Sequence, residues 1–335
     1  MLNIKQINRE KERYFVKQKI PVYILTGFLG SGKTTVLLNM LEHARKSGLK
    51  PGLLLNEAGS VNVERYLFQE ENMIELLDGC ICCSIKDDLV KACQFYLREE
   101  TQIDILFIEG TGVSNPKDIV AAFHNRGLSH YFEINSIINV IDASKYLEYK
   151  SVFSSSKEIR ELLKDQLEIS TLVLLNKIDL LNGRKKEKVI NHIRAQLNSN
   201  DQIVETTYGR ANGEILLKNR YIEERQTKEV QGNHHHHANG QHLHSFQTIK
   251  LELWSYVEKE VLEKWLISLP DYIYRGKGII QTKEKRLLQF QFSSRNVVFK
   301  EIDQFYHVTP CVILIGQDMN KQLIQNSFQE NVYSR

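Results

Sequence analysis

A glycine-rich segment near the N-terminus has the residue types that bind phosphate groups. Residues 27–34 read Gly-Phe-Leu-Gly-Ser-Gly-Lys-Thr and fit the pattern G-x-x-x-x-G-K-[ST], between an apolar run and an amphipathic stretch. The glycines let backbone N–H groups turn toward phosphate oxygens, and the N-terminus of the following helix adds a favourable dipole. Lys33 is expected to reach the β- and γ-phosphates, and the Thr34 hydroxyl to bind Mg²⁺. The predicted nucleotide-binding residues of this loop are Gly27, Gly30, Ser31, Gly32, Lys33, Thr34 and Thr35.

A second segment has the composition of a guanine-recognition element. Asn176-Lys177-Ile178-Asp179 follows an apolar run, well downstream of the glycine-rich loop. The Asp179 carboxylate can accept two hydrogen bonds, from N1–H and the 2-amino group of guanine, whereas adenine does not offer this pair of donors. Asn176 and Lys177 are expected to brace the base and the phosphate loop. Together with that loop, the segment predicts GTP rather than ATP as the nucleotide.

An acidic residue and a glycine follow a third apolar run, at residues 105–108. Glu109 is expected at the end of a buried strand beside the phosphate loop, where a carboxylate orients Mg²⁺ and its water molecules. Gly112 leaves room for its backbone N–H to approach the γ-phosphate. Lys33 and Glu109 are therefore the candidate catalytic residues of a GTPase that uses Mg²⁺.

Three cysteines occur within four residues, in the segment Gly79-Cys80-Ile81-Cys82-Cys83. Thiolates are soft ligands that suit Zn²⁺ or Cu(I), and zinc–sulfur sites prefer four tetrahedral donors. The segment supplies at most three donors, so the fourth must come from elsewhere, and Glu57 is a candidate. An incomplete donor set suits a metal carrier better than a permanent structural site. The other two cysteines, Cys93 and Cys311, are expected to be buried in the core.

Histidines are concentrated in the segment 233–244, which contains His234, His235, His236, His237, His242 and His244. Neutral imidazoles bind transition metals of borderline softness. We expect weak, exchangeable metal capture by this segment, and in particular by the four consecutive histidines; the alternative is a solvated polar loop without a ligand.

Composition excludes several classes of protein. The chain has 335 residues, with 44 Lys and Arg against 41 Asp and Glu and a formal net charge of +3. This balance disfavours a nucleic-acid-binding protein, which normally has a concentrated basic excess. No apolar run approaches the roughly 18 residues of a membrane helix, and residues 1–20 lack an apolar leader. Closely spaced cysteines indicate a reducing compartment, so the expected location is the cytoplasm.

Apolar runs alternate with amphipathic stretches along residues 20–217, which predicts βαβ units and a mostly parallel sheet. Strands are expected at 22–26, 52–56, 103–109, 136–141, 171–176 and 203–207. Helices are expected at 33–46, 85–99, 116–125, 157–167 and 185–197. The fold class is therefore α/β.

The composition changes after Leu217, where a polar stretch begins. Beyond it, strands are expected at 246–254, 279–282, 287–292, 296–299 and 312–315, with helices at 257–269 and 319–328. The predicted organisation is a polar N-terminal extension (1–19), a P-loop GTPase domain (20–217), a His-rich linker (218–245) and a smaller C-terminal α+β domain (246–335).

These motifs in this order resemble those of the CobW-type GTPases, a metallochaperone family in the SIMIBI class of P-loop proteins. The similarity covers nearly the whole chain after residue 20. It includes G-F-L-G-S-G-K-T-T at 27–35, N-E-x-G at 56–59, E-L-x-x-G-C-x-C-C at 75–83, E-x-T-G-x-x-x-P at 109–116, L-L-N-K-x-D-L at 174–180 and R-G-K-G at 275–278. The thiol segment and the His-rich linker are its most specific markers.

The resemblance implies slow GTP hydrolysis coupled to delivery of a metal to a client metalloprotein. Zinc is the metal most often implied, with Co²⁺ or another transition metal as the alternative. A nucleotide- or metal-dependent homodimer is also implied, as is a switch at residues 56–64 that senses the γ-phosphate. Ala58, Ser60 and Glu64 depart from the usual family pattern within this switch.

Three other functions stay open on the sequence alone. The first is a maturation factor for one cobalt or iron enzyme or for cobalamin synthesis, because the motifs do not encode the client. The second is a P-loop small-molecule kinase, which would leave Asp179 and the thiol segment unused. The third is a passive metal buffer, in which metal affinity would not depend on the nucleotide.

Overall fold

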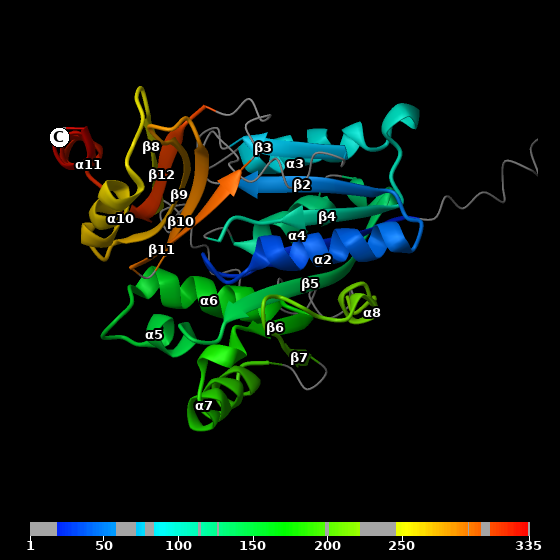
Figure 1. Ribbon diagram of the computed structural model, residues 1–335. Coiled ribbons are helices and arrows are strands. Elements are labelled where there is room, and N and C mark those ends of the chain that lie inside the picture. Colours follow the sequence, from blue (N-terminus) through cyan, green and yellow to red (C-terminus); the bar gives the residue numbers. More distant parts are fainter. Residues whose placement is uncertain are drawn as a thin grey trace, which may run out of the picture.

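The computed structural model describes residues 19–57, 72–77, 84–112, 115–125, 127–197, 201–221, 246–293, 295–302 and 309–333. The thiol segment, the His-rich linker and the N-terminal extension up to residue 18 lie outside these ranges. The described strands form one sheet of seven strands and one of five (Figure 1).

The larger sheet is parallel throughout, with the strand order β3-β2-β4-β1-β5-β6-β7. Its strands are β1 (Ile20–Thr26), β2 (Pro51–Glu57), β3 (Asn72–Leu77), β4 (Ile105–Glu109), β5 (Phe132–Asp142), β6 (Leu172–Asn176) and β7 (Gln202–Glu205). Every residue of β6 is buried, because helices cover both faces of the sheet.

The helices around this sheet are α2 (Lys33–Lys46), α3 (Ser84–Phe95), α4 (Pro116–Asn125), α5 (Tyr146–Lys150), α6 (Lys157–Ile169), α7 (Gly183–Arg194) and α8 (Gly213–Leu216). Successive residues of β1 point to opposite faces. Val22 and Ile24 pack with α3 and α4, whereas Tyr23 and Leu25 pack with α2 and α8. The 3-10 turns η2 (Glu99–Thr101), η3 (Leu128–His130) and η4 (Ile178–Leu180) lie between these elements.

The smaller sheet is antiparallel, with the order β11-β10-β9-β12-β8. Its strands are β8 (Phe246–Glu252), β9 (Ile273–Gln281), β10 (Leu287–Ser293), β11 (Asn296–Ile302) and β12 (Cys311–Gln317). Helices α10 (Lys259–Ser268) and α11 (Lys321–Phe328) cover one face, through a core that includes Trp265 and Phe328. A π-helical turn, η5 (Gln329–Tyr333), follows α11.

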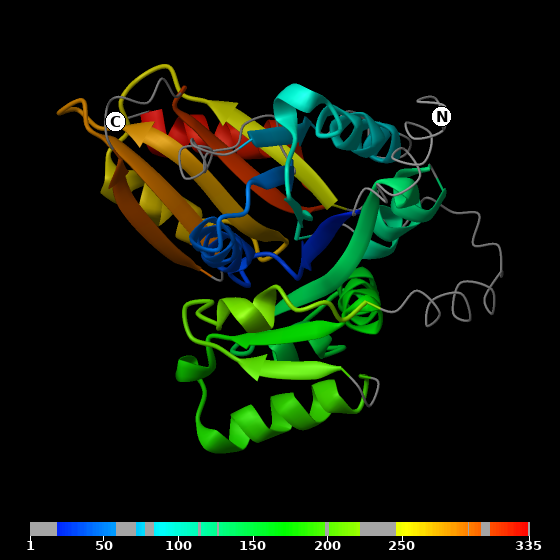
Figure 2. The ribbon, with the colours of Figure 1, turned by 90° about the vertical axis from the view of Figure 1, so that its right-hand side faces the viewer.

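The other face of the smaller sheet is turned toward the parallel sheet. In Figure 1 the arrowheads of β2 and β3 point at it, and in Figure 2 the blue helix α2 is seen end on beside the orange strands. Phe28 and Leu29, in the loop after β1, share an apolar cluster with Phe246 and Ile315 of the smaller sheet. The two sheets therefore meet at the glycine-rich loop.

The structure confirms the α/β class and most of the predicted elements, and it corrects several bounds. β9 begins at Ile273 rather than at residue 279, because Gly276 and Gly278 interrupt the apolar pattern that marks a strand. Those glycines lie under the Phe292 and Phe290 side chains, where a Cβ would come within 3.3 Å and 2.6 Å of ring or Cβ atoms. Helix α3 ends at Phe95 instead of residue 99, and β3, α5 and α8 were not predicted.

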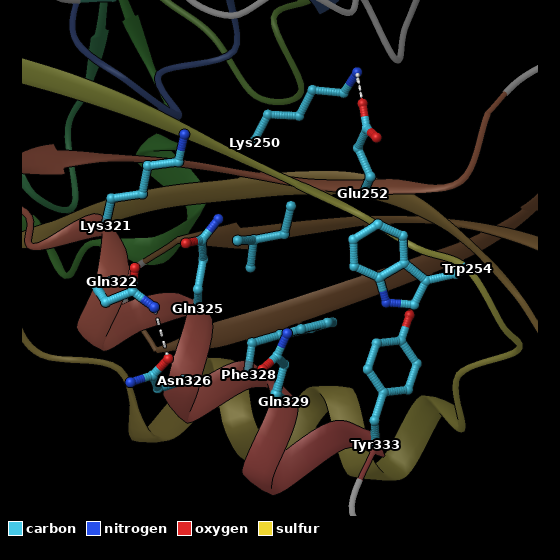
Figure 3. Close-up of a pocket in the computed structure, with 11 residues that line it drawn as sticks. Lys250, Glu252, Trp254, Lys321, Gln322, Gln325, Asn326, Phe328, Gln329 and Tyr333 are labelled. Carbon is cyan, nitrogen blue, oxygen red and sulfur yellow. Dashed lines mark hydrogen bonds and ion pairs between the residues drawn. The ribbon is translucent and has the colours of Figure 1, made fainter.

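A hollow of about 370 Å³ lies between the edge strand β8 and helix α11 (Figure 3). Trp254 and Tyr333 flank one end of it, and amide side chains of α11 line its floor. It is on the helical side of the smaller sheet, away from the glycine-rich loop. Among the described helices, none is long and apolar enough to cross a membrane.

Candidate functional site

The glycine-rich loop adopts a backbone conformation that only glycine tolerates at several positions. Gly27 has a φ of +132°, and a Cβ there would lie 2.1 Å from the Val140 carbonyl oxygen. Gly32 has a φ of +104°, and a Cβ there would lie 2.5 Å from the amide nitrogen of Asn176. The loop is thus fixed between β5 and β6 before helix α2 begins at Lys33.

The Lys33 side chain is buried and crosses the loop. Its ammonium donates hydrogen bonds to the carbonyl oxygens of Gly27, at 2.9 Å, and Phe28, at 3.4 Å. The next residue, Thr34, donates its hydroxyl to the Glu109 carboxylate at 3.2 Å, which joins the first turn of α2 to the end of β4. Thr35 is exposed on that same turn.

Gly112 lies against the loop from the other side. A Cβ at Gly112 would come within 2.7 Å of the Leu29 backbone nitrogen and within 2.6 Å of its side chain. No larger residue fits at this distance, so the segment after β4 approaches the loop with its backbone.

Asn176 and Lys177, at the end of β6, hold the loop by hydrogen bonds. Asn176 donates to the Ser31 carbonyl oxygen at 2.9 Å and accepts from the Gly209 backbone N–H at 2.8 Å. Lys177 donates to the Gly30 carbonyl oxygen at 2.8 Å. Asp179 follows in the turn η4, where its side chain is exposed.

Sequence reasoning missed Asp142, which orients Lys177. Its carboxylate lies 2.6 Å from the Lys177 ammonium, and it is largely buried at the end of β5. An acidic residue that ends an apolar run was the signal at Glu109, and the same signal is present at Asp142. Lys177 also has a left-handed backbone with a φ of 61°, a sparsely populated conformation for a residue other than glycine.

Two buried hydroxyl groups, one in the loop and one just before it, are suited to bind a phosphate group or a hydrated Mg²⁺ ion. Ser31 Oγ and Thr26 Oγ1 are each inaccessible to solvent, and neither has a hydrogen-bond partner among the described residues. A buried hydroxyl without a partner costs free energy, and a bound oxyanion or hydrated cation would remove that cost. The residues present therefore fit a nucleotide with Mg²⁺.

The predicted ligands of zinc are not among the described side chains. Cys80, Cys82, Cys83 and His234–His237 lie outside the described residues, and Glu57 is described only in its backbone. Within the described part of the chain, no group of three or more His, Cys, Asp or Glu residues could hold a metal ion. Cys93 and Cys311 are free and buried, as predicted, and burial raises the pKa of the Cys93 thiol to about 12.

A parallel sheet with a glycine-rich loop after its central β1 strand, and a buried lysine at the start of the following helix, defines a P-loop nucleotide-binding protein. Residues 21–205 match the family described as CobW/HypB/UreG, nucleotide-binding domain, and residues 246–332 match the cobalamin synthesis protein cobW C-terminal domain. The chain belongs to the CobW/HypB/UreG family and is a GTPase.

Similarity to known proteins extends along most of the chain. A protein named zinc chaperone CobW, from Sinorhizobium sp, is 27% identical, and the alignment covers 86% of this chain and 88% of the relative. Zinc-regulated GTPase metalloprotein activator 1 of Schizosaccharomyces pombe is 28% identical, with 90% and 83% covered. The solved Zn(II)-bound YjiA GTPase from E. coli is 20% identical, with 94% and 99% covered and a TM-score of 0.43.

Proposed function

We propose that this chain is a GTP-hydrolysing zinc metallochaperone in which Cys80, Cys82 and Cys83 hold the metal. The positions of β3 and α3, which flank the thiol segment in the chain, are the main support. β3 ends at Leu77 and α3 begins at Ser84, so the segment follows the carboxyl end of a parallel strand. Those ends share one edge of the sheet, and the phosphate loop follows β1 at the same edge.

The backbone also supports Glu57 as the fourth zinc donor. Glu57 ends β2 and pairs in register with Leu77, the last residue of β3 before the thiol segment. Glu57 also belongs to the expected switch, at residues 56–64. A donor at this position would connect metal binding to any movement of the switch.

In the nucleotide site, the proposed roles follow from the contacts described above. The loop 27–35 and the Gly112 backbone surround the phosphates, with Lys33 at the β- and γ-phosphates. Thr34 would hold Mg²⁺, and Glu109, which accepts the Thr34 hydrogen bond, would orient the ion's water shell. When bound, Mg²⁺ neutralises charge that develops on the phosphate oxygens.

The client is a metalloprotein, and His234–His237 supply weak capture of zinc, or of Co²⁺, before transfer. We also propose a homodimer that depends on nucleotide or metal, and a cytoplasmic location. A reducing compartment keeps cysteine thiols from forming disulfides. Cys93 and Cys311 are free thiols in the structure, which agrees with such a compartment.

Zinc affinity in two nucleotide states tests this function. We expect the purified chain to bind about one zinc ion with sub-micromolar affinity, and to release protons as the thiols ionise. The affinity should differ by at least about tenfold between GDP and a non-hydrolysable GTP analogue, because a ligand that binds both states equally shifts nothing. Competition with a chromophoric chelator measures it, and ATP analogues provide the control. Equal affinities would indicate a passive buffer.

Replacing Asp179 by Asn should change nucleotide specificity. The loss of a charged acceptor for guanine is expected to weaken GTP binding by about 10- to 100-fold and to favour xanthosine triphosphate, whose 2-oxo group needs a donor. Competition against a fluorescent nucleotide measures both effects. Glu187→Gln, at an exposed position on α7, is the matched control. A native chain that bound ATP as tightly as GTP would contradict the guanine assignment and favour a kinase.

A further inference from the structure

Lys277 is a charged residue buried inside the smaller sheet. It lies on β9 between Gly276 and Gly278, and its side chain is 1% exposed. Its neighbours across the sheet are Gln291 of β10 and Ile313 of β12. Lysine is almost never fully buried, which makes this position unusual for it.

The strand pattern shows which way the Lys277 side chain points. Phe290, Phe292 and Leu314 belong to the core that α10 and α11 cover, and they lie beside the two glycines. Adjacent residues of a strand point to opposite faces, so Lys277 points away from those helices. It therefore points from the face that is turned toward the parallel sheet (Figures 1 and 2).

This face of the smaller sheet meets the phosphate loop near Arg275, which is two residues before Lys277 on β9. Arg275 precedes it on that face and is paired with Ser293 on one side and Ile315 on the other. Ser293 Oγ lies 3.7 Å from the position of a Cβ on Gly30, and Ile315 packs with the apolar side chains of the loop. Arg275 and Lys277 are thus two cationic residues on the face of the smaller sheet that meets the loop.

The positive charges of Lys277 and Lys33 repel one another. The pKa of Lys277 is lowered to about 7, chiefly by burial; Cys311 opposes this shift, and the charge of Lys33, the smallest of the three causes, adds to it. Two ammonium groups that repel one another across a loop built for phosphate form a site that an oxyanion between them would stabilise.

We propose that Lys277 is a nucleotide ligand contributed by the C-terminal domain, whose ammonium binds an oxygen of the terminal phosphate held by the loop 27–34. This inference rests on the proposed nucleotide site but not on the zinc site. It gives the smaller sheet a direct contact that is present with GTP and lost with GDP.

The test compares two nucleotides in Lys277→Met, which removes the charge but keeps a long side chain. Isothermal titration should show about 10- to 100-fold weaker binding of a non-hydrolysable GTP analogue, because a charge-assisted hydrogen bond to phosphate is lost. GDP affinity should change by less than about threefold, since GDP lacks the terminal phosphate. Lys300→Met, at an exposed position on β11, is the matched control.

A merely structural role for Lys277 would affect both nucleotides equally or neither, and either result overturns the proposal. Thermal unfolding of each variant checks the fold, and Lys277→Gln serves as a second neutral variant if the methionine variant unfolds. If the native chain binds no GTP analogue, the proposed function fails. If the native chain and Lys277→Met bind it equally, only the role of Lys277 fails.

Discussion

Lys33→Ala is expected to lower the rate of GTP hydrolysis by at least about 100-fold while the fold is retained. The loss is large because the Lys33 ammonium is already positioned across the loop by two carbonyl oxygens. A preorganised donor at the transferring phosphoryl group contributes roughly this factor in enzymes. Single-turnover phosphate release measures the rate, and circular dichroism with thermal unfolding checks the fold.

Lys46→Ala is the matched control for this prediction. Lys46 lies at the other end of the same helix, where its exposed side chain pairs with Glu42 across one turn. This variant should hydrolyse GTP at the native rate. Turnover that persists in Lys33→Ala would mean that the phosphates bind elsewhere on the molecule.

Replacing Cys80, Cys82 and Cys83 together by Ser is expected to remove the tight zinc site. Serine hydroxyls are hard, neutral donors, so zinc affinity should fall by at least about 100-fold. The weak binding that remains should be that of His234–His237, and it should disappear when these four are also replaced by Ala. Chelator competition and proton release on zinc addition give independent readouts.

The other two cysteines provide the control for the triple variant. Cys93→Ala with Cys311→Ala removes two thiols that are fully buried and lie on α3 and β12. Zinc affinity should be unchanged in this double variant. If the triple variant binds zinc as tightly as the native chain, the metal is carried by other residues and the proposed transfer mechanism is wrong.

The parallel sheet could be predicted because its signals are local. β1, the glycine-rich loop and α2 are consecutive in the chain, and each has a strong pattern: an apolar run, fixed glycines and an amphipathic repeat. β9 could not be bounded in the same way, because its glycines are explained by the two neighbouring strands: by Phe290 and Phe292 of β10, and by Cys311 and Leu314 of β12. That information is tertiary, so no reading of residues 273–281 alone supplies it.

Some residues of the candidate site could likewise be predicted from local patterns, and others could not. The residue types of Lys33, Thr34 and Asn176 are diagnostic by spacing, and the structure places them around one loop. Asp142 ends an apolar run and Lys277 lies in the R-G-K-G segment, but neither pattern assigns the residue a role by itself. Their relevance follows from a partner or a neighbour far away in the chain, Lys177 for Asp142 and the phosphate loop for Lys277.

The apolar cluster around Phe28 has a thermodynamic consequence. Because Phe28 and Leu29 belong both to the phosphate loop and to the surface that the smaller sheet covers, loop conformation and sheet docking are one linked equilibrium. This linkage is reciprocal. If a bound nucleotide raises the equilibrium constant for docking of the smaller sheet by some factor, docking raises the affinity for that nucleotide by the same factor. A client that bound the C-terminal sheet in its undocked position would therefore lower the affinity for the nucleotide. It would promote nucleotide release, as an exchange factor does, without contacting the nucleotide.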